Sequence, residues 1–173
     1  RINESKFVWM DRFTFRNLEI FSSNAGKDGV SLAEVLDKSA SPMGARLLRQ
    51  WLAMPIIDRA ALNERYDIVE YFIHNEDILE QLRGLISEVG DLERILSRAA
   101  TGRIIPREMV QLGRSLRQMQ PIKDLCSEEG EIPVSLTKLI KGMKNCSRLL
   151  ERLSNTMVEN PAVQIGKGEV IAR

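Results

Sequence analysis

A series of arginines in the second half of the chain is the strongest candidate for a binding site. The series comprises Arg94, Arg98, Arg103 and Arg107. The first two lie one helical turn apart, at i and i+4, and a short turn at Gly102 brings the other two near them. A guanidinium presents a planar fork of N–H donors that binds the oxygens of phosphate or carboxylate groups. One interpretation is therefore a contact with phosphate groups or with an acidic partner.

The same arginines have an alternative role within the fold. Acidic residues adjoin them in the sequence, namely Asp91, Glu93 and Glu108. Ion pairs with these carboxylates, or with neighbouring helices, would account for the series without any ligand. The whole-chain charge does not indicate autonomous nucleic-acid binding, because the chain has 25 Lys and Arg against 24 Asp and Glu. A DNA-binding module typically has a much larger basic excess.

Residue types for catalysis, metal binding or nucleotide binding do not come together in the sequence. His74 is the only histidine, so no Ser–His or Cys–His pair for nucleophilic catalysis can be proposed. Cys126 and Cys146 stand singly rather than at zinc-ligand spacing. Gly166-Lys167-Gly168 lacks the spacing and the hydroxyl residue of a P-loop. We therefore expect no catalytic residue, no cofactor-binding residue and no metal site in this chain.

Aromatic residues in the first half of the chain follow helical spacing. They are Trp51, Tyr66, Tyr71 and Phe72. Aromatic rings can form a platform on which nucleic-acid bases stack, but these positions fall on the apolar faces of helices and predict core residues instead. The clearest apolar stripe consists of Leu62, Tyr66, Val69 and Ile73. We expect its side chains to be buried.

Helix-boundary residues recur from Ser31 onward and decide the fold class. The expected helix starts are a Ser-x-x-Glu capping box at Ser31 and Glu34, Ser41 before Pro42, Asp58, Asp91 and Pro106. The expected helix ends are Pro55, Gly102 and Pro121. No repeat of fixed length is present, which disfavours a solenoid. The sequence predicts a mainly α protein, an irregular multi-helix assembly.

The opening segment is the one part with a strand-like composition. Aromatic and β-branched residues are frequent over residues 7–21, which predicts one or two short strands. Residues 22–29 are small, polar or glycine, as in an exposed turn. The expected regions are a strand-like entry segment and loop over 1–30, a helical core domain over 31–158, and an extended segment over 159–173.

Several features indicate a cytoplasmic protein and a chain taken from a longer one. Cys126 and Cys146 are expected to be reduced thiols, because they stand among charged helical segments. No apolar run approaches the roughly 20 residues of a membrane span, and no signal peptide is recognisable. The first residue is Arg1 rather than Met, and residues 168–173 end on an apolar alternation. We expect both ends to be internal cuts.

Blocks of residues along nearly the whole chain resemble the core, or lever, domain of the MutS family of DNA mismatch-recognition proteins. The blocks are residues 10–21 (MDRFTFRNLEIF), 41–52 (SPMGARLLRQWL), 65–72 (RYDIVEYF), 91–95 (DLERI), 102–108 (GRIIPRE) and 159–161 (ENP). Met10 and Ser41 stand where the family usually has Leu and Thr. Several blocks in the right order make the resemblance specific.

The resemblance implies that this chain transmits conformational change between other domains. In MutS proteins the core domain connects a clamp, which encircles DNA and is inserted into the core, to an ATPase domain through long lever helices. Mismatch reading lies in an N-terminal domain and the Walker motifs in a C-terminal one. The chain would then be the first half of the core of a bacterial mismatch-repair member, and would end near the first lever helix. Its role would be to transmit conformational change, with no activity of its own.

The resemblance also implies the partners and cofactors of a parent protein. Such a parent would be a DNA-dependent ATPase that binds double-stranded mismatched DNA, pairs with a MutL-type partner and forms a homodimer. ATP and Mg²⁺ would bind in an ATPase domain outside this chain. The expected location is cytoplasmic and associated with the nucleoid, with no membrane contact.

Three other interpretations stay open. The chain could come from a recombination-associated MutS paralogue. It could be an autonomous helical DNA-binding module that uses the arginine series. It could also be a protein-interaction module unrelated to DNA, for which a large exposed apolar patch would be typical.

Overall fold

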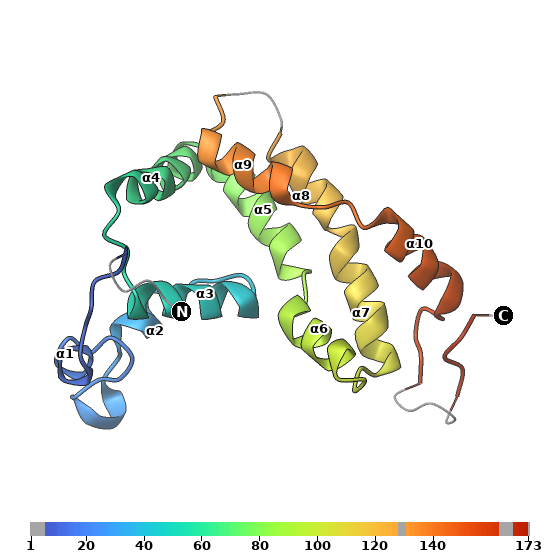
Figure 1. The fold of residues 1–173 in the computed structure, drawn as a ribbon, viewed down its shortest axis with the longest axis horizontal. Helices are drawn as coiled ribbons and strands as arrows, with labels where there is room; N and C mark the ends of the chain where they lie inside the picture. The colour runs from blue at the N-terminus through green and yellow to red at the C-terminus, as the bar shows by residue number, and fades with distance from the viewer. Residues whose placement is uncertain (1–5, 128–130, 163–167, 173) are drawn as a thin grey trace. The chain divides into compact units, whose positions relative to one another are not determined.

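A computed structural model describes residues 6–127, 131–162 and 168–172. Its regular structure is helical, as predicted (Figure 1). The elements are α1 (Arg12–Asn17), the 3₁₀ helix η2 (Gly26–Asp28), α2 (Leu32–Leu36), α3 (Pro42–Ala53), α4 (Arg59–His74), α5 (Glu76–Ser87), α6 (Leu92–Ala100), α7 (Pro106–Arg117), α8 (Met119–Leu125), α9 (Val134–Gly142) and α10 (Ser147–Thr156).

The chain divides into two compact units. The first unit ends at Asp67 and the second begins at Ile68, within α4. The predicted regions 1–30, 31–158 and 159–173 stay predictions. The predicted extended segment over 159–173 includes residues 163–167 and 173, which lie outside the described residues.

The strands predicted near the N-terminus are wrong, because the first unit forms a short helix there. Asp11 is the N-cap of α1, and its carboxylate accepts the backbone N–H of Thr14 at 2.6 Å. This local bond satisfies a backbone donor that a strand would have to pair with a neighbour. Among the described residues 6–11, pairing is limited to an isolated antiparallel bridge between Phe7 and Ile56. Composition alone therefore gave the wrong element type.

The predicted capping box is confirmed at the start of α2. Ser31 is 1% exposed, and its hydroxyl accepts the N–H of Glu34, whose carboxylate accepts the Ser31 N–H at 2.8 Å. The N-terminus of α2 also joins the preceding segment, because the Leu32 N–H donates to the carbonyl of Glu19 at 2.9 Å. Ser41 caps α3 ahead of Pro42, also as predicted. The two caps define where α2 and α3 begin, and the Leu32 bond joins α2 to the preceding segment.

The expected burial of the stripe on α4 is wrong for most of its members. Tyr66 is 62% exposed, Val69 55% and Ile73 62%. Trp51, another expected core residue, is 40% exposed, and the guanidinium of Arg65 lies 3.7 Å from its ring centroid. A periodic stripe shows that one face of a helix can be buried, whereas burial itself needs an element to cover that face.

The second unit contains a core shared by three helices. Helix α7 packs against α6, α8 and α10, and α5 packs against α8 (Figure 1). Ile95, Leu112 and Leu153, from α6, α7 and α10, form one buried cluster. Leu92, Ile104, Met109, Leu116 and Met157 pack around it. Helix α7 is therefore the element around which this unit is built.

Most predicted helix boundaries of the second unit are confirmed. The Asp91 carboxylate accepts the N–H of Arg94, and Gly102 has a φ of +68°, a left-handed conformation suited to glycine just after α6. Pro121 was predicted to end a helix and is instead inside α8. It lies in the first turn, where a missing N–H costs no helical hydrogen bond. Within the described residues, no helix is long and apolar enough to cross a membrane.

Candidate functional site

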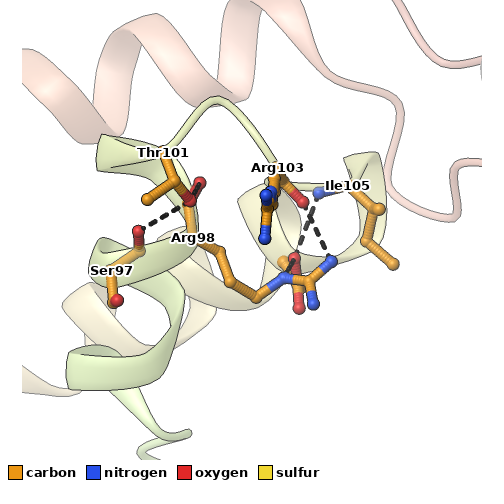
Figure 2. A network of polar contacts seen from close by, with 6 residues as sticks. Ser97, Arg98, Thr101, Arg103 and Ile105 are labelled. Carbon is orange, nitrogen blue, oxygen red and sulfur yellow. Dashed lines mark hydrogen bonds and ion pairs between the residues drawn. The ribbon is translucent and has the colours of Figure 1, made fainter.

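The turn between α6 and α7 is organised by two charged side chains (Figure 2). The Arg98 Nε donates to the Glu108 Oε2 at 2.8 Å, and the Arg98 Nη2 donates to the carbonyl oxygen of Arg103 at 2.9 Å. The same Glu108 oxygen accepts the N–H of Ile105 at 3.1 Å. A guanidinium from α6 and a carboxylate from α7 thereby bind each other and the backbone of the turn at Arg103 and Ile105.

The backbone brings these groups together through local bonds. The Thr101 hydroxyl donates to the carbonyls of Ser97 and Arg98, each at 3.1 Å, at the end of α6. The Arg103 N–H then donates to the Arg98 carbonyl at 2.8 Å, which closes the turn. Pro106 begins α7 directly afterwards. The side chains of Arg98 and Glu108 are 36% and 22% exposed, so water reaches the ion pair and weakens it.

The four predicted arginines have different surroundings within the fold. Arg98 pairs with Glu108, which confirms the alternative of a role within the fold for this residue. Arg107 donates from its Nε to the carbonyl oxygen of Pro161 at 3.3 Å. Within the described part of the chain, the side chains of Arg94 and Arg103 have no hydrogen-bond or ion-pair partner. A phosphate or partner contact of the series stays a prediction.

A basic groove along α7 was missed in the sequence. Its arginines are Arg107, Arg114 and Arg117, on α7, and Arg114 donates from its Nη2 to the carbonyl oxygen of Glu159 at 3.2 Å. One hollow of about 340 Å³ is lined by Arg107, Val110, Gln111, Arg114, Glu159, Asn160 and Pro161. The signal available in the sequence was the seven-residue spacing of Arg107 and Arg114, which places them on one face of a helix.

A comparison with known protein families identifies the family of the chain. Residues 13–173 match the family model described as MutS domain III. The chain belongs to the MutS domain III family. The resemblance inferred from the sequence blocks is thereby confirmed over most of the chain.

The chain is similar to the DNA mismatch repair protein MutS of several bacteria. The DNA mismatch repair protein MutS of Christiangramia forsetii is 42% identical over 99% of this chain, and that of Phocaeicola vulgatus is 41% identical over 99%. The MutS of Parabacteroides distasonis is 38% identical over 100% of the chain. This MutS domain III chain spans 19–20% of the length of these relatives.

Other reactive groups of this MutS domain III chain lie apart from the groove. The described residues contain no cluster of three or more His, Cys, Asp or Glu side chains placed to hold a metal ion. Cys126 is 3% exposed, and burial raises the pKa of its thiol. The Ser135 hydroxyl is buried without a hydrogen-bond partner among the described residues. Cys126 directly follows α8 and Ser135 lies in α9, so each is a single group outside the groove.

Proposed function

We propose that this chain is the first half of the core domain of a DNA mismatch-recognition ATPase, and that it links the DNA clamp to the ATPase domain. The observation that carries this proposal is the match over residues 13–173 to MutS domain III, in a chain that spans 19–20% of relatives named for mismatch repair. The role is to transmit conformational change, and the chain has no catalytic activity of its own.

The packing of the second unit supports a transmitting role. Three helices share the cluster of Ile95, Leu112 and Leu153, so a displacement of one helix must move or repack the others. The ion pair of Arg98 and Glu108 fixes the turn that joins two of these helices. Packed helices that shift as units carry conformational change between distant sites in many proteins.

The remaining activities are assigned to other parts of a longer protein. ATP and Mg²⁺ bind in an ATPase domain outside this chain, because Gly166-Lys167-Gly168 lacks the spacing of a P-loop. Mismatched double-stranded DNA is held by the full protein, which acts as a homodimer and with a MutL-type partner. The protein works in the cytoplasm, on the DNA of the nucleoid.

Two assays on the isolated chain test this assignment. We expect no ATP hydrolysis, and no preference for a mismatched over a matched duplex in a gel-shift assay at about 0.15 M salt, where weak surface electrostatics are largely screened. A clear mismatch preference would overturn the proposal.

The same assay separates the proposal from an autonomous DNA-binding module. In such a module, the duplex affinity would fall with salt, and reversing the charge of Arg98 or Arg103 would lower the salt slope by about one for each lost phosphate contact. Arg12→Glu, at an exposed position of the first unit, controls for the general effect of the same charge change. A salt slope that these arginine substitutions lower, but the control does not, would favour the module.

A further inference from the structure

The described C-terminal residues form an antiparallel pair of backbone segments. The segments are residues 156–162 and 168–172, which we term the C-terminal arm. Three backbone hydrogen bonds join them: Val158 N–H to Val170 O at 3.1 Å, Ala162 N–H to Glu169 O at 3.0 Å, and Ala172 N–H to Thr156 O at 2.9 Å. Two paired segments are marginally stable by themselves in water. The arm therefore depends on what holds it to the rest of the unit.

Two arginines on one face of α7 bind the backbone of the arm. Arg107 donates to the carbonyl oxygen of Pro161 at 3.3 Å, and Arg114 donates to that of Glu159 at 3.2 Å. The two arginines lie about 10 Å apart along the helix, since each residue rises about 1.5 Å. The arm runs opposite to α7, so the earlier arginine meets the later carbonyl. The two contacts fix both the register and the direction of the arm.

The chemistry of the two contacts suits a fixed attachment. A guanidinium carries five N–H donors and stays charged at any physiological pH, and charged donors make stronger hydrogen bonds than neutral ones. The acceptors are uncharged carbonyls, so neither contact depends on the protonation of a partner. The contact at buried Pro161 is partly buried, whereas the contact at Glu159 is exposed.

We propose that Arg107 and Arg114 are positioning residues that hold the C-terminal arm on α7 as a two-point latch. The Arg107 contact is the anchor, and the Arg114 contact is the point at which the arm is released first. The inference goes beyond the function proposed above and does not depend on it, because neither DNA nor nucleotide takes part in the latch.

Amide hydrogen exchange on the chain tests the latch. The amides of Val158, Ala162 and Ala172 report on the arm, and those of Leu112 and Leu153 report on the core of the same unit. The variants are R107M, R114M and the double variant. Arg117→Met is the matched control, since Arg117 is an exposed arginine of α7 beside the same arm and has no hydrogen bond within the described residues.

The latch predicts a local effect. Exchange of the three arm amides becomes about tenfold faster in the double variant, a smaller increase occurs in R114M, and the core amides stay within about twofold. Arg114→Lys keeps part of the protection that R114M loses, because an ammonium group can also donate to the Glu159 carbonyl. R114M replaces an exposed side chain and is expected to fold, so the exchange of the arm amides can be measured in R114M even if R107M does not fold.

Three outcomes would overturn the latch. The arm amides could exchange at the wild-type rate in the double variant. They could accelerate as much in R117M as in R114M. The core amides could accelerate as much as the arm amides, in which case the arginines support the whole unit rather than the position of the arm.

Discussion

Arg98 on α6 and Glu108 on α7 form an ion pair at 2.8 Å across the turn that joins the two helices. Glu108 also accepts the N–H of Ile105 just before α7, so one carboxylate serves as a partner for the guanidinium and as a cap for the helix. Arg98, which the sequence indicates as a possible ligand-binding residue, thus stabilises the turn between α6 and α7.

Removing this carboxylate should destabilise the second unit. We expect Glu108→Ala to lower the free energy of unfolding by about 1–2 kcal/mol, because it removes the partly exposed ion pair and a helix cap. Arg98→Met should cost less, about 0.5–1 kcal/mol. Urea unfolding measures both. Arg103→Met is the control, since its side chain is exposed; a loss in this control equal to that in Arg98→Met would contradict the role of the ion pair.

The shared core should be sensitive to a cavity. Leu112 is 8% exposed and lies between Ile95 and Leu153, so Leu112→Ala should cost about 2–5 kcal/mol of unfolding free energy. Leu96 is 55% exposed on the neighbouring helix, and Leu96→Ala should change stability by less than about 0.5 kcal/mol. Denaturant unfolding compares the two. Equal losses would show that α6 and α7 do not pack as described.

Acid should lower the stability of the first unit, because three of its carboxylates accept local hydrogen bonds in the folded state. Hydrogen bonds from the backbone and hydroxyl of Ser31 lower the pKa of Glu34 below its ordinary value of 4.5, and hydrogen bonds from Thr14 and Ser39 lower the pKa values of Asp11 and Asp37 below 3.8. A lowered pKa in the folded state contributes stability above the ordinary value, and that stability is lost as the pH falls through the lowered value.

Titration of the Glu34 carboxyl carbon by NMR measures this effect. Its midpoint should lie below 4.5 and should rise in Ser31→Ala, which keeps the backbone donor but removes the hydroxyl. Ser87→Ala is a control, because the Ser87 hydroxyl bonds to the Gly84 carbonyl in the other unit. A Glu34 midpoint at or above 4.5 in the unmodified chain would refute the capping explanation.

The two thiols should differ in reactivity. Cys126 is 3% exposed with a pKa raised by burial, whereas Cys146 is partly exposed. A thiol reagent needs access to a thiolate. We expect one thiol, that of Cys146, to react in the native chain and the second to react after unfolding. Mass spectrometry of the labelled peptides identifies each site, and rapid labelling of Cys126 under native conditions would contradict its burial.

Local signals in the sequence predicted the starts of α2, α3, α4, α6 and α7. Ser31 with Glu34, Ser41 before Pro42, and Asp91 act through bonds to residues at most three positions away, so their effects could be read from the sequence. The wrong prediction at α1 also concerns a local signal. Asp11 with Thr14 is also a local cap, whereas the strand prediction rests on the aromatic and β-branched composition around it.

Long-range relationships were harder to predict. The exposure of Tyr66 and Ile73 depends on whether another element covers α4, which periodicity does not reveal. The bonds from Arg107 and Arg114 reach carbonyls 54 and 45 residues further along the chain. A backbone carbonyl is present at every residue, so no residue type in the sequence marks it as the partner of an arginine.

The most direct test of the transmitting role is the coupling between ATP and DNA in the full-length protein that carries this chain. The dissociation constant for a mismatched duplex is measured with and without ATP, in the unmodified protein and in Ile95→Val and Arg98→Met, with Leu96→Ala as the control. Coupling of this kind typically changes an affinity about 5- to 150-fold. We predict that this factor shrinks towards one in both variants, while ATP hydrolysis without DNA and duplex affinity without ATP stay within about twofold. A coupling factor that stays at the unmodified value in both variants, after hydrogen exchange has shown that the α6–α7 packing is loosened, would contradict a transmitting role for this domain.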